Sequence, residues 1–284
     1  MRSRLLLNLA LLLALLALGL FAYFRPAEEA AEKIQVTELK REDVERIRVE
    51  HNQFDYQLER RDGSWFVTAP YQTLANQLLV DRLLDMTMAT ASGEFPAEKL
   101  ARYGLEPVKS RVTLNDQAFE FGDINDITNE QYLASNGRVY LVRTFYGYGL
   151  PADGAQMISP RLLADHEKPV EYDFGAWQAV QDDKGAWTIR GAPPERGDVA
   201  PSADDLNIWV AEWKLASGMS VIPFEGEAGG DRVIVRFSNG ESAAFHVIAR
   251  EPDIQLVRAD ARMQYKFGTD AGSRLLDPYR VAQQ

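Results

Sequence analysis

The chain offers few residues that could do chemistry, and their spacing forms no catalytic set. Its three histidines are His51, His166 and His246, and none stands in an H-E-x-x-H or other metal-ligand spacing. The absence of cysteine removes the ligands that most structural zinc sites use. No G-x-S-x-G elbow, P-loop or G-x-G-x-x-G segment occurs. We therefore expect a protein that is not an enzyme and that binds no metal ion and no cofactor.

Two loops invite an ion-binding interpretation that their details do not favour. Residues 123–130 carry several Asp and Asn oxygens of the kind that Ca²⁺ prefers. Position five of an EF-hand pattern would be Ile127, however, and the central glycine is missing. A polar loop between strands is the expectation there. Gly147 and Gly149 lack the strand before and the helix after that a dinucleotide site needs, so they are expected to mark a turn.

Three aromatic residues are the candidate partner-binding residues. Phe145, Tyr146 and Tyr148 lie in the Gly-rich stretch TFYGYGLP, which is expected to connect two units of the chain. Tyr and Phe are enriched at protein interfaces. The alternative is that these rings fill the seam between the two units, since large apolar groups usually find cover. Trp209 and Trp213, four residues apart on an expected helix, are predicted to pack in a core.

The elements that must position these residues are built around a stretch that occurs twice. The segment at 54–70, FDYQLERRDGSWFVTAP, recurs in diverged form at 176–193, AWQAVQDDKGAWTIRGAP. Gly63 corresponds to Gly185 at an offset of 122 residues, and each is followed two residues later by Trp. A tight hairpin turn needs positive φ, which glycine adopts without steric cost. Each copy is therefore predicted to be a β-hairpin.

Turn dipeptides and helical spacing predict the remainder of the first unit. Apolar residues at helical spacing predict a helix over 73–90, and a shorter helix is expected at 95–103. Hairpins are expected to turn at Asn-Asp 115–116 and at Asn-Gly 136–137. A short helix at 158–165 is expected to lead into the second unit.

The second unit is predicted to repeat this order. Ser202 or Asp204 can cap a helix that runs to about Ala216. Two further hairpins are expected around Asn-Gly 239–240 and around the turn at 259–262. Each unit thus reads as a hairpin, a helix and a meander of strands, which is an antiparallel α+β pattern.

These elements predict an α+β fold with a transmembrane helix followed by two tandem units. Residues 1–25 comprise the N-terminal cytoplasmic residues and the anchor, with the helix at about 5–24. A polar stalk is expected at 26–33, the first unit at 34–158 and the second unit at 159–284.

The anchor prediction depends on a nearly unbroken apolar run. Leu5 to Phe24 spans 20 residues with only Asn8 polar, and about 20 such residues cross a bilayer as a helix. Arg2 and Arg4 precede the run, which favours a cytoplasmic N-terminus and a translocated bulk. We therefore predict a single-pass protein of the bacterial inner membrane with its bulk in the periplasm. A cleaved signal peptide is the alternative.

The charge of the chain argues against two kinds of anionic partner. Its net charge is −11, with 42 acidic and 31 basic residues, and the three arginines within residues 1–25 make the remainder more acidic still. Nucleic acid and anionic lipid headgroups attract Lys/Arg patches, so neither is expected to bind the bulk of the chain.

The order of several segments resembles a bacterial family known as domain of unknown function 4340. The segments are RIRVEH from Arg46, DGSWFVTAP at 62–70, YGLEP at 103–107, FGD at 121–123 and QYLASNGRVYLV at 131–142. The resemblance covers the first unit well and the second loosely. It implies a membrane-anchored envelope protein, of a kind often encoded with ABC-type transporters related to gliding-motility export systems. It implies no catalytic or binding residues.

Three hypotheses for function follow. The first is a non-catalytic auxiliary or scaffold component of an ABC-type transport complex, which acts through protein contacts. The second is an envelope module that binds a glycan or another polymer through Phe145, Tyr146 and Tyr148. The third is an uncharacterised hydrolase, for which no nucleophile–base pair or metal set is recognisable in the sequence.

Overall fold

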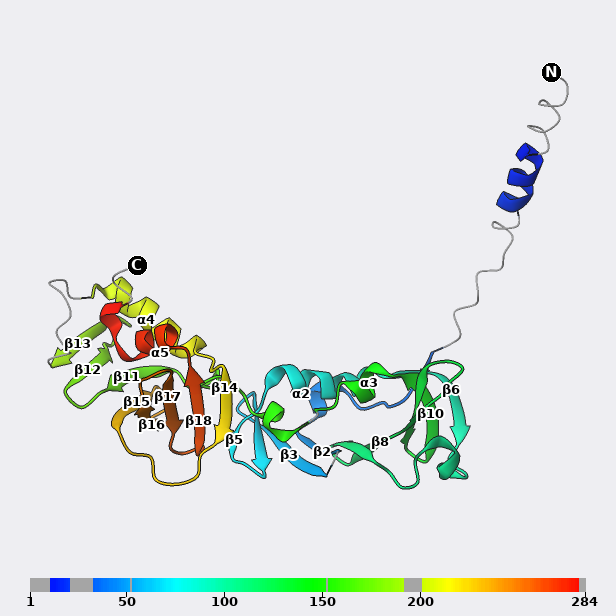
Figure 1. Ribbon diagram of the computed structural model, residues 1–284, viewed down its shortest axis with the longest axis horizontal. Helices are drawn as coiled ribbons and strands as arrows, with labels where there is room; N and C mark the ends of the chain where they lie inside the picture. Colours follow the sequence, from blue (N-terminus) through cyan, green and yellow to red (C-terminus); the bar gives the residue numbers. More distant parts are fainter. Residues whose placement is uncertain (1–10, 21–32, 52, 152, 192–200, 281–284) are drawn as a thin grey trace, which may run out of the picture.

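The protein consists mainly of β-strands in two antiparallel sheets, one per unit, with the short helices gathered on one side of both (Figure 1). Among the described residues, the first sheet has ten strands and the second has eight. The computed structural model describes residues 11–20, 33–51, 53–151, 153–191 and 201–280.

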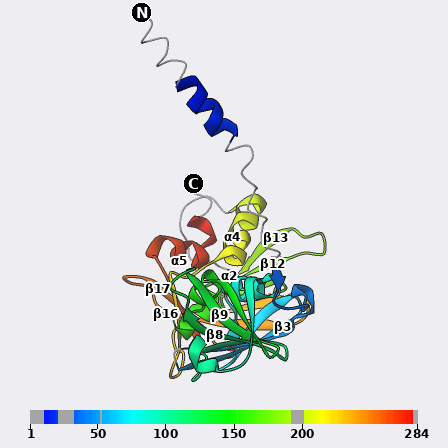
Figure 2. The ribbon, with the colours of Figure 1, turned by 90° about the vertical axis from the view of Figure 1, so that its right-hand side faces the viewer.

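The first sheet is antiparallel throughout and forms a curved layer beneath the helices when seen from the end of the molecule (Figure 2). Its strands stand in the order β1 (Ile34–Gln35), β6 (Thr90–Pro96), β10 (Arg138–Arg143), β9 (Glu130–Ser135), β8 (Gln117–Ile124), β7 (Ser110–Leu114), β2 (Arg46–His51), β3 (Phe54–Arg61), β4 (Ser64–Ala69) and β5 (Thr73–Leu74).

The predicted hairpins of the first unit are confirmed, and local backbone preference explains them. β3 and β4 pair across Asp62 and Gly63, whose φ values are 48° and 78°. β9 and β10 pair across Asn136 and Gly137, with φ values of 50° and 73°. Asn, Asp and Gly are the residues that enter this left-handed region at least cost. The turn dipeptides alone therefore locate these strand pairs.

The second sheet repeats the connectivity of the first. The order β4-β3-β2-β7-β8-β9-β10-β6 in the first sheet corresponds strand for strand to the order in the second. That order is β13 (Trp187–Gly191), β12 (Trp177–Gln181), β11 (Pro169–Asp173), β15 (Asp231–Phe237), β16 (Ser242–Ala249), β17 (Ile254–Arg258), β18 (Met263–Phe267) and β14 (Ser220–Pro223). In both sheets, the strand that precedes the four-stranded meander in the chain lies beyond the last strand of that meander.

In the part of the chain that the structure describes, four short helices cover these sheets. They are α2 (Gln77–Leu84), α3 (Phe145–Tyr148), α4 (Ala203–Leu215) and α5 (Thr269–Leu276). The predicted α4 is confirmed, and its N-cap is Ser202 rather than Asp204. The Ser202 hydroxyl accepts from the N–H of Asp205, whose carboxylate accepts from the N–H of Ser202. This capping box satisfies two N–H groups that a helix start would otherwise leave unpaired.

Tryptophan side chains organise the core of the second unit. Trp209 and Trp213 of α4 are both 0% exposed, and each indole N–H donates to the carbonyl of Leu275. Their rings contact Tyr172, which is also fully buried. The prediction that this Trp pair packs in a core is confirmed. Trp187 lies in the same core and its counterpart Trp65 in the core of the first unit.

The segment that joins the two units is hydrogen-bonded to both of them. Ser159 donates its N–H to the carbonyl of Leu74 in the first unit (2.8 Å), while the carbonyl of Pro160 accepts from Gly218 in the second (2.8 Å). Tyr71 packs against the hydrophobic cores of both units. Because two consecutive residues, Ser159 and Pro160, are hydrogen-bonded to different units, no free linker separates the units.

The predicted helices of the first unit are wrong in three places. The helix expected over 73–90 is reduced to α2 and a 3-10 turn that ends at Met88. The first residues of the helix expected at 95–103 instead finish strand β6, which pairs with β1 and β10, and a 3-10 helix at Leu100–Tyr103 is what remains of it. The segment 158–165 forms isolated bridges rather than a helix. Pairing with distant strands overrides local helical spacing at each place.

These differences correct the predicted fold class. The protein is mostly β, with two antiparallel sheets, and the predicted α+β class is wrong. The physical reason is that strands such as β6 and β14 gain their hydrogen bonds only from partners far away in the chain, so local patterns do not mark them.

The predictions of a transmembrane anchor and of a single-pass inner-membrane location are corrected as well. Among the described residues, no helix is long and apolar enough to cross a membrane. Within the predicted span, residues 11–20 form a helix. The flanking positions 5–10 and 21–24, and the predicted stalk up to residue 32, lie outside the described residues.

Candidate functional site

The three predicted partner-binding aromatics form one short helix on the first unit. Phe145, Tyr146 and Tyr148 all belong to α3. Phe145 and Tyr148 are 44% and 75% exposed, whereas Tyr146 packs against the core of the first unit. The interpretation that these rings fill the seam between the units is wrong, because Tyr71 and the connecting segment occupy that place.

Tyr146 and its neighbouring glycine hold α3 against the sheet. Burial raises the pKa of the Tyr146 phenol, and the nearby Asp85 carboxylate adds to the shift. A Cβ atom at Gly147 would lie 2.1 Å from Oε1 of Gln131 on β9. Gln131 is itself held there, since its amide donates to the carbonyl of Gly122 (2.9 Å). The close approach at Gly147 lets α3 sit on the sheet while its two other aromatic rings stay in solvent.

A cavity of about 490 Å³ opens beside these rings. Arg82 and Asp85, at the end of α2, form one wall, and Phe145 and Tyr148 form the other. The guanidinium carbon of Arg143 lies 5.0 Å from the centre of the Phe145 ring. Such a cation–ring contact is attractive and steadies an exposed ring.

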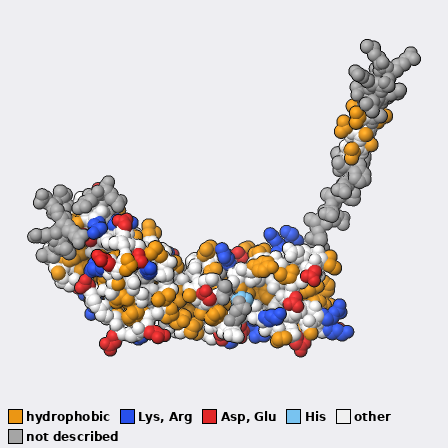
Figure 3. Space-filling view, in the orientation of Figure 1, with side chains coloured by type: hydrophobic (Ala, Val, Ile, Leu, Met, Phe, Trp, Pro, Cys, Tyr) orange, Lys and Arg blue, Asp and Glu red, His pale blue; other side chains and the backbone are white. Residues whose placement is uncertain are grey.

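Leu78 extends this surface along α2. It is 62% exposed and lies four residues before Arg82, so both side chains lie on the same face of the helix. We call Leu78, Arg82, Phe145 and Tyr148 the α2–α3 surface. On the face of the molecule drawn in Figure 3, apolar side chains lie interspersed with charged groups over both units. The α2–α3 surface thus combines exposed aromatic, aliphatic and guanidinium groups.

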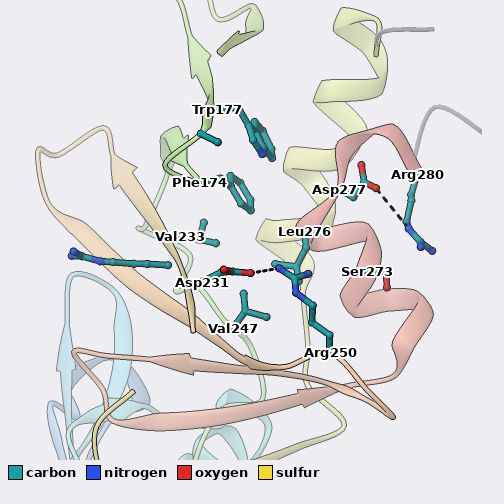
Figure 4. A pocket seen from close by; sticks show the side chains of 12 residues that line it. Phe174, Trp177, Asp231, Val233, Val247, Arg250, Ser273, Leu276, Asp277 and Arg280 are labelled. Atoms are coloured by element: carbon teal, nitrogen blue, oxygen red, sulfur yellow. Dashed lines mark hydrogen bonds and ion pairs between the residues drawn. The ribbon is translucent and has the colours of Figure 1, made fainter. Parts of the chain in front are cut away.

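A second cavity of about 480 Å³ lies in the second unit, where sequence patterns predicted no site. Figure 4 shows Phe174 and Trp177 on one side of it and the α5 residue Ser273, with Asp277 and Arg280 beyond the helix, on the other. The twelve lining residues come from positions 174 to 280, so no local motif could have revealed the cavity.

The histidines are dispersed rather than brought together. His51 lies on β2 in the first unit, His166 in the connecting segment and His246 on β16 in the second unit. His166 Nδ1 lies 3.4 Å from Oγ of Ser64, and its ring meets the Phe66 ring edge to face at 6.0 Å. Within the described residues, no group of three or more His, Asp and Glu side chains could hold a metal ion.

The polar loop at 123–130 is closed by one side chain. Oδ1 of Asn125 accepts from the N–H groups of Ile127 and Thr128, and its amide nitrogen donates to the hydroxyl of Tyr132 (2.8 Å). This is an Asx turn, in which the side chain replaces a backbone partner. The loop therefore uses its Asn oxygen for its own structure.

His51 provides a pH-dependent contact in the first unit. Its Nδ1 lies 2.6 Å from Oγ of Ser110, directly across the β2–β7 pair. Burial lowers the pKa of His51 from 6.5, so the folded protein favours the neutral ring. The unfolded chain then binds more protons than the folded chain, and the free energy of unfolding falls as the pH falls below 6.5 through the folded pKa.

We expect replacement of His51 by Gln to remove this contribution. As the pH falls from 7.5 to 5.5, the wild type should lose more of its free energy of unfolding than His51→Gln does, because the variant has no imidazole to protonate. Urea unfolding at several pH values measures that difference, and the comparison cancels the titration of other groups. A difference that is constant, or that moves the other way, contradicts the lowered pKa.

Comparisons with known proteins give one finding. The family model of a domain of unknown function, DUF4340, matches residues 65–214, which is more than half of the chain. The match runs from β4 of the first unit to the end of α4 in the second, and so crosses the connecting segment. No curated protein and no solved structure matches the chain. The resemblance carried by the sequence segments is confirmed, and this chain is a member of the DUF4340 family.

Proposed function

We propose that this chain is a non-catalytic scaffold protein that binds a partner protein through the α2–α3 surface. The observation that carries the proposal is that α3 is attached to the first unit by one aromatic ring and exposes two others. Its central ring, Tyr146, packs against the core of the first unit, while Phe145 and Tyr148 on either side project from the same short helix into solvent. Rings held in this way lose little conformational freedom when a partner covers them.

The composition of the α2–α3 surface favours a protein as the partner. Tyr, Phe and Arg are enriched in protein interfaces, and Tyr and Arg supply a large share of the residues whose loss weakens binding most. Leu78 and Phe145 add apolar area that a partner would remove from water. The resemblance to proteins encoded with ABC-type transporters makes a permease or ATPase subunit of such a transporter the expected partner.

The test is site-specific crosslinking from Tyr148 in cells that express the full-length chain. A photoreactive phenylalanine analogue at position 148 should crosslink to a transporter permease or ATPase subunit. The matched control is the same analogue at Phe54, an aromatic residue of β3 that is 40% exposed outside the α2–α3 surface. Position 54 should give no such product.

Affinity measurements then separate binding from folding. The double variant Phe145→Ala/Tyr148→Ala should weaken binding of the crosslinked subunit at least about tenfold, as expected for interface rings of this kind. Its Tm should match that of Phe54→Ala. Unchanged affinity, or equal crosslinking from both positions, would overturn the proposal. Retention on an envelope glycan that depends on Phe145 and Tyr148, without a protein partner, would favour the glycan-binding alternative.

A further inference from the structure

The helices α4 and α5 of the second unit lie side by side (Figure 1) and border a groove of about 420 Å³, which we call the α4–α5 groove. The indole N–H groups of Trp209 and Trp213 on α4 both donate to the carbonyl of Leu275 on α5. Nε of Arg274 on α5 also donates to the carboxylate of Glu212 on α4 (2.9 Å). The groove therefore lies between two helices that are already held together.

Small side chains line much of this groove. Ala211 lies on α4, Ala216 at its end and Ala271 on α5. The ring of Phe267 and the side chain of Leu275 complete the apolar lining. The distance between packed helices depends on the side chains at their contact, so small residues here allow another helix to approach closely.

The helix α4 is apolar on two sides, and only one of them is covered. Trp209 and Trp213 are buried in the core of the unit, whereas Ile208 and Leu215 line the groove and are 53% and 73% exposed. Ile208 and Leu215 are seven residues apart, so they share one face of the helix over about two turns. A surface helix normally presents polar side chains opposite its buried face. The second apolar face of α4 therefore indicates a surface that a partner covers.

Exposed apolar side chains are concentrated around this groove. Among the described residues of the second unit, the large apolar side chains that are exposed are Ile208, Leu215, Met219 and Ile222. The segment from Leu215 to Phe224 contains no charged residue, although 26% of the chain is charged. Single exposed apolar residues are ordinary on a protein surface, but a cluster of them marks an interaction site.

The charged groups beside the groove are mainly acidic. Arg274 is held between two carboxylates, those of Glu212 and Asp270, and Asp270 is 85% exposed. Asp204 lies four residues before Ile208, so it is on the groove side of α4, and it forms no ion pair with the residues that the structure describes. One guanidinium thus faces three carboxylates, which favours a partner with positive charge beside its apolar face.

The same charges disfavour a second copy of this chain as the occupant. Two copies that meet through the same surface would bring Asp204 and Asp270 of both into one interface. Each copy also has a net charge of −11. Lys214 does not offset this repulsion, because it lies six residues after Ile208 and therefore on another side of α4.

We propose that the α4–α5 groove binds an amphipathic helix of a partner protein. The apolar side chains of that helix, three and four residues apart, lie between Ile208, Leu215 and Ala271, and its Lys or Arg side chains lie beside Asp204 and Asp270. Amphipathic helices bind apolar grooves in this manner in many complexes. The groove shares no residue with the α2–α3 surface, so this binding is independent of the proposed scaffold contact.

Model helices test the proposal by calorimetry on the full chain. The basic peptide acetyl-KLAKLAKKLAKLAK-amide has leucines three and four residues apart and should bind with a Kd of about 100 μM or tighter. The acidic peptide acetyl-ELAELAEELAELAE-amide has the same leucines and should bind at least about tenfold more weakly, because the carboxylates at the groove repel it. A basic peptide of the same composition, with its leucines spread around the helix, should also bind at least about tenfold more weakly, since it has no apolar face.

Variants decide whether the basic peptide binds in the groove. The double variant Ile208→Ser/Leu215→Ser changes two exposed side chains and should raise the Kd at least about tenfold. Leu215→Ser alone is the second variant if the double variant does not fold. Ile127→Ser is the matched control, since Ile127 is 93% exposed in the first unit, and it should leave the Kd unchanged. Phe145→Ala/Tyr148→Ala should also leave it unchanged, which separates this site from the α2–α3 surface.

Four results would overturn the proposal. The first is the absence of binding of the basic peptide, and the second is equal binding of the basic peptide and either of the other two. The third is an equal effect of Ile208→Ser/Leu215→Ser and either the Ile127→Ser or the Phe145→Ala/Tyr148→Ala control. The fourth comes from sedimentation velocity: a wild-type dimer that Ile208→Ser/Leu215→Ser dissociates would assign the groove to a second copy of the chain.

Discussion

Replacement of Trp213 by alanine is expected to lower the free energy of unfolding by about 3–5 kcal/mol, the usual cost of removing a large buried ring. The side chain is 0% exposed and contacts the rings of Tyr172 and Phe245, with centres 5.2 and 5.6 Å away. Its indole N–H also donates to the carbonyl of Leu275 at 2.7 Å, which joins α4 to α5. The substitution leaves a cavity and removes this link between the two helices.

Chemical denaturation of the variant and of two controls measures this effect. Ile208→Ala changes a residue of the same helix that is 53% exposed. This substitution should change the free energy of unfolding by less than about 0.5 kcal/mol. Trp213→Phe keeps most of the apolar volume but removes the N–H donor, so it should cost less than Trp213→Ala. If Trp213→Ala and Ile208→Ala destabilise the protein equally, Trp213 does not anchor the core as described.

Replacement of Glu167 by Gln is expected to cost about 3 kcal/mol, because removal of one member of a buried ion pair leaves the other charge inadequately compensated. The side chains of Glu167 and Arg258 are only 9% and 11% exposed. Arg258 donates to both oxygens of Glu167 and to the carbonyl of Leu162, and Glu167 also accepts from the N–H of Ala164. This network fastens the connecting segment to β17.

An exposed pair in the same segment provides the control. Asp165 is 80% exposed and pairs with Arg161 at 2.7 Å. Asp165→Asn should change stability by less than about 1 kcal/mol, as surface ion pairs generally do. Urea unfolding of both variants measures the two costs. A loss below about 1 kcal/mol for Glu167→Gln would show that Asp260, the other carboxylate on Arg258, compensates the charge by itself.

The hairpins show why part of the fold could be predicted. Asp62-Gly63 and Asn136-Gly137 adopt positive φ because of their own residue types, whatever surrounds them. Ser202 caps α4 through bonds to residues three positions away. These turns and this cap depend on interactions within a few residues of chain, so they can be predicted from the local sequence.

Strand β6 and the short helix α3 show why the remainder of the fold and of the candidate site could not be predicted. Thr90 to Pro96 becomes a strand because β1 and β10 offer partners on both sides. For the candidate site, the sequence identified Phe145 and Tyr148 by type, but only packing showed that Tyr146 between them is structural.

By itself, the sequence determined the turns, the hairpins that they close, the capped start of α4 and the membership of the family. The tertiary structure alone decided that the chain is mostly β, that α3 lies on the first unit rather than at the seam, and that Ile208 and Leu275 line one groove. The physical reason is the range of the forces involved. Backbone φ preferences act within a turn, whereas strand pairing and burial join residues far apart in the chain and depend on the whole fold.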